Sequence, residues 1–246
     1  DLADLGSLVM TPAGDYAGTP TLGFSVATNE GGTASVSLPV TVTPVADAPS
    51  LTASAAGVDE GSPITLNIAT AETDVDGSEV LTMTIAGVPS DATLSVGTPN
   101  ADGTWTLTAD EVAGLSATPL VLTPSANFNG TIDLSVTSTS TDTLGAVSDS
   151  AATTVAVSIV VAPVGDEPGI SVVGSGTGVE DGTVPLGIQV TPVGGETLAS
   201  VTITGVPGDA TLSLGSQNQD GSWTISGLDL ADLGSLVMTP AGDYAG

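Results

Sequence analysis

The chain has 246 residues, 28 of them Asp or Glu and none Lys, Arg, His or Cys, so its formal net charge is −28. Without His or Cys there is no serine–histidine triad, thiolate nucleophile or soft zinc site. Without Lys or Arg there is no side-chain cation for phosphate, nucleic acid or a Schiff base. The oxygen ligands that remain suit Ca²⁺, and we do not expect an enzyme. A glycosidase built on a carboxylate pair stays formally open, but aromatic residues are only 2% of the chain.

Hydrophobic residues make up 40% of the chain, which is enough to bury a core despite the charge. No apolar run reaches 18 residues, so we expect no direct membrane insertion. No signal peptide opens the sequence, and Asp1 is expected to lie inside a domain. The absence of cysteine argues against a disulfide scaffold, but an extracellular domain can be held together by metal instead.

The sequence repeats itself. The segment DLADLGSLVMTPAGDYAG occupies residues 1–18 and again residues 229–246, an offset of 228. A weaker repeat relates Gly87-Val88-Pro89 to Gly205-Val206-Pro207, an offset of 118. We therefore predict one complete repeat over 47–165, the N-terminal part of another over 166–246, and the C-terminal part of another over 1–46. Either the parent polypeptide continues past both ends, which we favour, or a neighbouring chain completes each half.

Short β-rich runs with period-two alternation fill the complete repeat. In chain order the predicted strands are 50–56, 63–70, 80–87, 92–96, 104–108, 120–123, 130–139 and 151–161. One helical turn is predicted over 108–115, with Thr108 and Glu111 as a capping box, and an equivalent turn over 226–233. The expected fold is all-β: immunoglobulin-like or cadherin-like sandwiches in a linear tandem array.

Six aromatic residues occupy corresponding repeat positions and are expected to pack in the core, with carbohydrate stacking as the alternative. They are Tyr16, Phe24, Trp105, Phe128, Trp223 and Tyr244. Four acids in turns are interpreted as turn formers. They are Asp91, Asp102, Asp209 and Asp220.

Three acidic clusters recur near the predicted domain ends, and we predict that they bind Ca²⁺, because no cation of the chain can offset them. The predicted ligands are Asp47, Asp166 and Glu167 at the junctions, Asp59, Glu60, Glu180 and Asp181 after the first strand, and Asp74, Asp76 and Glu79 in a loop. The matching loop of the next repeat, 192–196, keeps only Glu196, so we expect it to bind Ca²⁺ weakly or not at all.

The order of these motifs resembles the tandem cadherin-like or bacterial immunoglobulin-like repeats of giant bacterial adhesins, including VCBS-type and biofilm-associated RTX adhesins. The series runs from Asp-x-Pro through Val-Asp-Glu-Gly and Asp-Val-Asp-Gly-Ser-Glu to Thr-Pro-x-x-x-Phe-x-Gly, and it covers essentially the whole chain. The resemblance implies type I secretion, Ca²⁺-dependent folding outside the cell, and a role as an extender between an anchored end and a ligand-binding tip.

The leading hypothesis is a structural extender of a secreted, cell-surface adhesin, whose partners are neighbouring repeats of the same polypeptide. One alternative is a subunit of a self-assembling extracellular filament, in which identical chains complete one another by strand addition. A second alternative is a glycan-binding or ice-binding module.

Overall fold

The computed structural model describes all residues except 1, 75–76, 180, 228–229 and 243–246. The chain divides into two compact units, Asp1–Pro163 and Val164–Gly246. Strands make up most of the ordered structure and helices very little, which confirms the predicted all-β sandwich class. None of the helices in the described residues is long and apolar enough to cross a membrane.

The first 46 residues contain a short 3₁₀ helix and one β-hairpin. The helix η1 spans Leu2–Ser7, and strands β1 (Thr21–Ala27) and β2 (Thr33–Pro39) pair antiparallel with Thr21 opposite Pro39. An isolated bridge between Gly18 and Val42 extends the pairing beyond the named strands.

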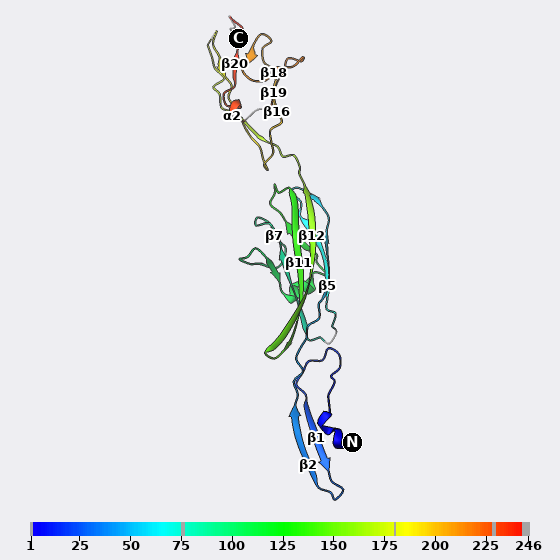
Figure 1. Cartoon of the computed structure of the whole chain (residues 1–246). Helices are drawn as coiled ribbons and strands as arrows, with labels where there is room; N and C mark the ends of the chain where they lie inside the picture. Colours follow the sequence, from blue (N-terminus) through cyan, green and yellow to red (C-terminus); the bar gives the residue numbers. More distant parts are fainter. Residues whose placement is uncertain (1, 75–76, 180, 228–229, 243–246) are drawn as a thin grey trace. The chain divides into compact units, whose positions relative to one another are not determined.

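Residues 50–162 form a complete sandwich of two sheets (Figure 1). The first sheet has the order β3-β5-β10-β7: β3 (Ser50–Ala55), β5 (Ile64–Ala71), β10 (Leu120–Thr123) and β7 (Thr93–Leu94). The second has the order β4-β12-β11-β6-β9-β8: β4 (Val58–Asp59), β12 (Val147–Ala162), β11 (Gly130–Leu144), β6 (Glu79–Ala86), β9 (Trp105–Leu107) and β8 (Thr98–Pro99).

The core of this sandwich comes from alternate residues of the long strands, as the period-two pattern predicts. Ile64 and Leu66 of β5 face Ile85 of β6 and Val136 of β11 in one buried cluster. Burying each such aliphatic side chain contributes about 1.5–3 kcal/mol, so the core is the main source of stability in a chain without Lys, Arg or His.

The predicted helical turn is confirmed as α1 (Ala109–Gly114), with Thr108 as its N-cap residue. The Thr108 backbone N–H and hydroxyl donate to the Glu111 carboxylate at 2.8 and 2.9 Å, and the Gly97 N–H donates to it at 3.1 Å. These bonds stabilise the ionised form, so they lower the pKa of Glu111, with the Thr108 N–H as the largest cause. Through Glu111, these bonds connect the first turn of α1 to Gly97, the residue that precedes β8.

The second unit repeats much of this plan. Its described residues form three sheets, with the orders β13-β15, β14-β20-β17 and β16-β19-β18. The elements are β13 (Gly169–Val172), β14 (Val184–Pro185), β15 (Ile188–Thr191), β16 (Ser200–Ile203), β17 (Thr211–Leu212), β18 (Ser216–Gln217), β19 (Trp223–Ser226), α2 (Leu230–Leu233) and β20 (Val237–Thr239). Ile203 lies opposite Trp223, as Ile85 lies opposite Trp105 in the complete sandwich.

The aromatic prediction is partly wrong. Trp223 is buried, and Trp105 and Phe128 pack against the core, but Phe24 is 39% and Tyr16 42% exposed. The reason is that, in the described part of the chain, β1 and β2 form a two-stranded sheet by themselves, with no further strand at either edge. Tyr244 lies outside the described residues.

Two strands also extend further than the sequence pattern predicts. The expected ranges 130–139 and 151–161 are β11 and β12, which run to Leu144 and start at Val147. The buried face of β11 continues past Val136 through Ser138, Ser140 and Asp142, so its apolar signal ends before the strand does. This polar extension carries part of the site described next.

Candidate metal centre

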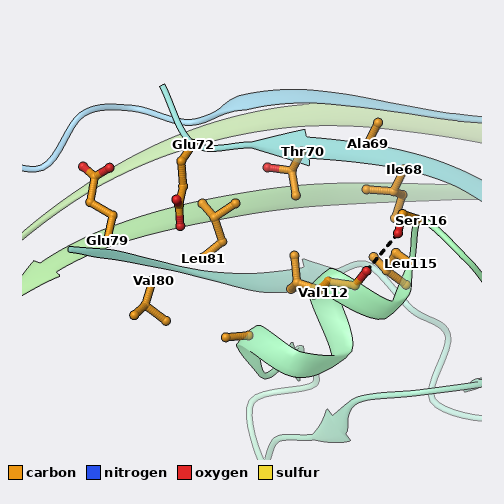
Figure 2. Close-up of a pocket in the computed structure, with 12 residues that line it drawn as sticks. Ile68, Ala69, Thr70, Glu72, Glu79, Val80, Leu81, Val112, Leu115 and Ser116 are labelled. Carbon is orange, nitrogen blue, oxygen red and sulfur yellow. Dashed lines mark hydrogen bonds between the residues drawn. The ribbon is translucent and has the colours of Figure 1, made fainter. Parts of the chain in front are cut away.

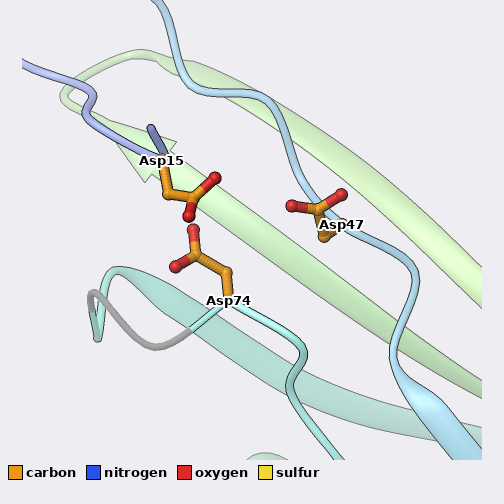
Figure 3. A group of neighbouring side chains, drawn as sticks. All are labelled: Asp15, Asp47 and Asp74. Carbon is orange, nitrogen blue, oxygen red and sulfur yellow. The ribbon is translucent and has the colours of Figure 1, made fainter. Parts of the chain in front are cut away.

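Three carboxylates from separate segments meet beside the first junction (Figure 3). Asp15, Asp47 and Asp74 each place one oxygen within 4.8 Å of the others. Asp15 precedes β1, Asp47 precedes β3, and Asp74 lies in the β5–β6 connection. Asp15 has φ +63°, a left-handed conformation that Asp tolerates better than most residues. The predicted junction and loop clusters thus form one group rather than two.

A second row of acids crosses three neighbouring strands of the adjacent sheet, close to their ends. Asp142 of β11 is directly opposite Glu79 of β6 on one side and Asp149 of β12 on the other. Like charges directly opposite one another on neighbouring strands are destabilising. The sheet therefore carries three carboxylates in consecutive strands at its end.

The junction backbone is tied to this row. The Ala46 N–H donates to Asp149 Oδ2 at 3.1 Å, and the Asp47 N–H donates to Glu79 Oε1 at 3.2 Å. Both bonds hold the segment that carries the Asp47 side chain. The row of acids and the group around Asp74 are consequently parts of one acidic site.

Several of these acids are buried. Asp142 is 3%, Asp74 5% and Glu79 7% exposed. Asp142 Oδ1 has no hydrogen-bond partner among the described residues. Burial raises the pKa of Glu79, the Asp47 N–H opposes that shift, and the charges of Asp74, Glu72 and Asp142 add to it.

Repulsion makes this arrangement costly without a cation. Two charges about 5 Å apart repel by about 3 kcal/mol at an effective dielectric near 20. The chain offers no Lys, Arg or His to offset it. A buried carboxylate oxygen without a partner costs a further penalty of several kcal/mol unless it is neutralised or ligated. The site therefore favours a bound cation or protonation.

The donor set fits Ca²⁺. All the ligating atoms are hard oxygens, and Ca²⁺ binds six to eight of them at about 2.3–2.6 Å. Two oxygens bound to one such ion lie up to about 5 Å apart, and the three carboxylate oxygens lie within 4.8 Å of one another. A cavity of about 240 Å³ beside the group is lined by Asp15, Asp47 and Asp142.

No protein-family model matches the chain, and no curated protein matches it. The functional argument therefore depends on this site and on the repeat pattern. The resemblance to adhesin repeats remains a resemblance in motif order alone.

The second predicted cluster lies elsewhere. Asp59 pairs with Ala162, and the Glu60 N–H donates to the Ala162 carbonyl at 2.9 Å. The Glu60 carboxylate accepts from Asn129 Nδ2 at 3.1 Å. Asp149 lies near the opposite end of the same strand, roughly 40 Å away at about 3.3 Å per residue. The structure thus does not bring Asp59 and Glu60 to the first junction.

The second junction keeps one feature of the first. The Asp166 N–H donates to Glu196 Oε1 at 3.1 Å, in the same way as Asp47 does to Glu79. Its loop has Gly194 and Gly195 in place of the acids. Glu167 and Asp181 are exposed, and no group of three carboxylates gathers in the described residues of this unit. Asp76 and Glu180 lie outside the described residues.

Sequence reasoning missed Asp15, Asp142 and Asp149. The alternation that runs from Val136 through Ser138 and Ser140 would have pointed to Asp142, because it places that side chain on the buried face. The prediction that Asp102 is a turn former is confirmed, since its Oδ1 accepts from the Thr104 N–H and hydroxyl at 3.0 and 2.7 Å.

A larger cleft of about 480 Å³ lies between β5, β6 and α1 (Figure 2). Its walls are aliphatic, from Ile68, Leu81, Val112 and Leu115, and Glu72 and Glu79 also line it. None of the described residues that line it is aromatic, and aromatic rings are the stacking surface that sugar sites use.

Proposed function

We propose that the chain is a structural extender of a secreted bacterial adhesin, made of β-sandwich repeats and stabilised by Ca²⁺ at the first junction. One observation carries the proposal. Asp142 is 3% exposed, its Oδ1 has no hydrogen-bond partner in the described structure, and it lies among further carboxylates in a chain without cations. Such a group needs a positive charge from solution.

Four side chains would hold the ion: Asp15, Asp47, Asp74 and Asp142. They come from the segment before β1, the junction, the β5–β6 connection and the end of β11. An ion bound by all four would fix the segment containing Asp15 against the sandwich. It would act as a cross-link in place of a disulfide, which the chain cannot form.

Ca²⁺ would also make folding depend on the compartment. In a Ca²⁺-poor cytosol the uncompensated carboxylates destabilise the folded junction and keep the chain loose for export. Outside the cell, an ion that binds only the folded state stabilises it by about 2.7 kcal/mol at a hundredfold excess over its Kd. Reach and stiffness for adhesion or biofilm formation would follow from the ordered junction.

Thermal unfolding in millimolar Ca²⁺ and in EGTA tests this proposal. Stabilisation of that size corresponds to a rise in Tm of roughly 10 °C for a repeat of this length. Small-angle scattering should show a more compact first unit with Ca²⁺. The control variant Asp102→Asn removes an exposed turn acid and should keep the full Ca²⁺ response. A Tm and a scattering profile that do not respond to Ca²⁺ would contradict the proposal.

A further inference from the structure

The cleft between β5, β6 and α1 borders the edge of a strand. Three consecutive residues of β5, namely Ile68, Ala69 and Thr70, line it. Successive side chains of a strand point to opposite faces of the sheet, so a cavity lined by three of them in a row lies along the strand's edge. A second cavity of about 370 Å³ shares Ile68, Ala69, Leu115 and Ser116 with the cleft and extends it along β5. All of these residues lie inside the complete sandwich.

The edge of β5 is open beside this cleft. Its partner β10 begins at Leu120, opposite Leu66, because the chain before Leu120 forms α1 and a turn instead of a strand. In the described structure no other strand lies beside residues 67–71 on this side, whereas β3 pairs with them on the other side. An open strand edge next to a cavity is a geometry that accepts an added strand.

The direction of the backbone groups on this edge follows from β10. The Ser95 N–H donates to the Val121 carbonyl at 2.9 Å, so the backbone groups of Val121 point toward β7. Neighbouring residues of an antiparallel strand bond to opposite sides, so the residues before and after Val121 bond to β5. One of their partners is Leu66. By the same alternation, the N–H and C=O groups of Ile68 and Thr70 point to the open side.

The cleft has an acidic end and an aliphatic end (Figure 2). Glu72, which directly follows β5, and Glu79, which begins β6, lie at one end, and Ile68 and Leu115 lie at the other. The chain has no Lys, Arg or His to pair with either carboxylate. The volume of about 480 Å³ is within the range of ligand sites. A ligand with a cation at one end and an aliphatic group at the other would complement both ends.

We propose that the cleft binds an extended peptide segment of another protein, which adds as a strand to the open edge of β5. The segment runs antiparallel to β5, in line with β10, and its backbone bonds to Ile68 and Thr70. Residues directly opposite one another in an antiparallel pair lie on the same face, so those opposite Glu72 and Ile68 point into the cleft. The segment therefore carries a Lys or Arg, followed four residues later by an aliphatic residue.

The charge of the chain decides which partner fits. A second copy of this chain cannot supply the segment, because it has no Lys or Arg. The partner is thus a different protein with a basic, strand-forming segment. None of the four proposed Ca²⁺ ligands lines the cleft, so the peptide site can fail or succeed independently of the Ca²⁺ site.

Labelled peptides test the pairing by fluorescence anisotropy with the full chain in millimolar Ca²⁺. The probe is acetyl-Lys-Thr-Val-Thr-Leu-Thr-amide, whose Lys, Val and Leu lie opposite Glu72, Thr70 and Ile68. N-methylation of its Val removes an N–H that faces β5 and should weaken binding about tenfold. N-methylation of the Thr after it removes an N–H that faces away, and this matched control should keep the affinity.

The charge is tested with a probe that has Gln in place of Lys, which should bind about tenfold more weakly. The proposal is overturned if the parent probe does not bind, if the two N-methylated probes lose affinity equally, or if the Gln probe binds as well as the parent.

Two pairs of variants locate the site on the protein. Glu72→Gln should weaken binding of the parent probe about tenfold, whereas Glu30→Gln removes an exposed acid of the β1–β2 turn and should not. Ala113→Trp fills the cleft from α1 and should abolish binding. Ala117→Trp places the same side chain on an exposed residue that does not line the cleft, so it should preserve binding.

Thermal melts should show that all four variants fold, since none of the four residues is buried. Binding that survives Ala113→Trp, or equal losses from both tryptophan variants, would show that the peptide does not lie in the cleft and would overturn the proposal.

Discussion

The two junctions of this chain share a backbone bond and differ in charge. In both, the N–H of the junction aspartate donates to a glutamate carboxylate, Asp47 to Glu79 and Asp166 to Glu196. Among the described residues, the first junction adds further acids from the loop and from the extended β11–β12 hairpin. The shared bond therefore belongs to the fold of the junction, and the additional carboxylates are what require a cation.

Asp142→Asn should give the largest effect, and its sign should depend on Ca²⁺. In EGTA the substitution removes repulsion from Glu79 and Asp149, so the free energy of unfolding should rise by about 1–3 kcal/mol. In Ca²⁺ it removes a ligand, so most of the Ca²⁺-induced rise in Tm should be lost. Denaturant unfolding in the two buffers measures both. The same sign in both buffers would show that Asp142 acts through packing alone.

Acidification should weaken Ca²⁺ binding before the exposed acids titrate. Burial, together with the neighbouring charges, raises the pKa of Glu79 above its ordinary value of 4.5. Without Ca²⁺ the folded state binds this proton more tightly than the unfolded chain. Protonated Glu79 therefore makes its whole contribution to folded-state stability below about pH 4.5, and that contribution is lost as the pH rises through the raised pKa.

With Ca²⁺ the dependence reverses, since a bound ion needs ionised carboxylates and its affinity falls as the pH falls. Calcium titrations at several pH values measure how the Ca²⁺ affinity depends on pH. Thermal melts in EGTA at the same pH values measure how stability without Ca²⁺ depends on pH. Glu79→Gln should abolish most of both dependences. A Ca²⁺ affinity that is constant down to the titration range of exposed acids would contradict the account.

Glu79→Gln and Glu196→Gln should separate the effect of the shared hydrogen bond from the effect of the glutamate charge. Each keeps an amide oxygen that can accept from the junction N–H. Glu196→Gln should therefore change stability in EGTA by about 1 kcal/mol or less, whereas Glu79→Gln should raise it, because it also removes the repulsion from Asp74, Glu72 and Asp142. Only Glu79→Gln should also change the Ca²⁺ response. Equal Ca²⁺ effects from the two variants would show that the junctions do not differ in this way.

The smallest effects are expected at the turn acids, which are equivalent in the two units. Asp102 and Asp220 each accept from the hydroxyl and the N–H two residues later, which lowers the pKa of both. Asp102→Asn and Asp220→Asn should each lower Tm slightly and equally, with or without Ca²⁺. Their stabilising contribution should be lost as the pH falls through the lowered pKa values.

The sequence predicts the sandwich well because its strands alternate and its turns carry glycine at positive φ, as at Gly87 and Gly205. It predicts the site only in part. Asp47 and Asp74 belong to local acidic motifs, whereas Asp15 and Asp149 reach the site only through tertiary structure. The apolar pattern of the sequence does not identify Asp142 as a buried residue of β11, because Ser138 and Ser140 interrupt that pattern. The exposure of Phe24 could not be predicted from its repeat position, since it depends on which strands face it.

Calcium titration by calorimetry on paired double variants tests the central claim most directly. Asp47→Asn/Asp74→Asn removes two ligands from the first junction, and Asp166→Asn/Glu167→Gln removes the same number of charges from the second. The account predicts that the tightest class of Ca²⁺ sites disappears in the first variant and is retained in the second. Identical isotherms for both variants and the unmodified chain would contradict it.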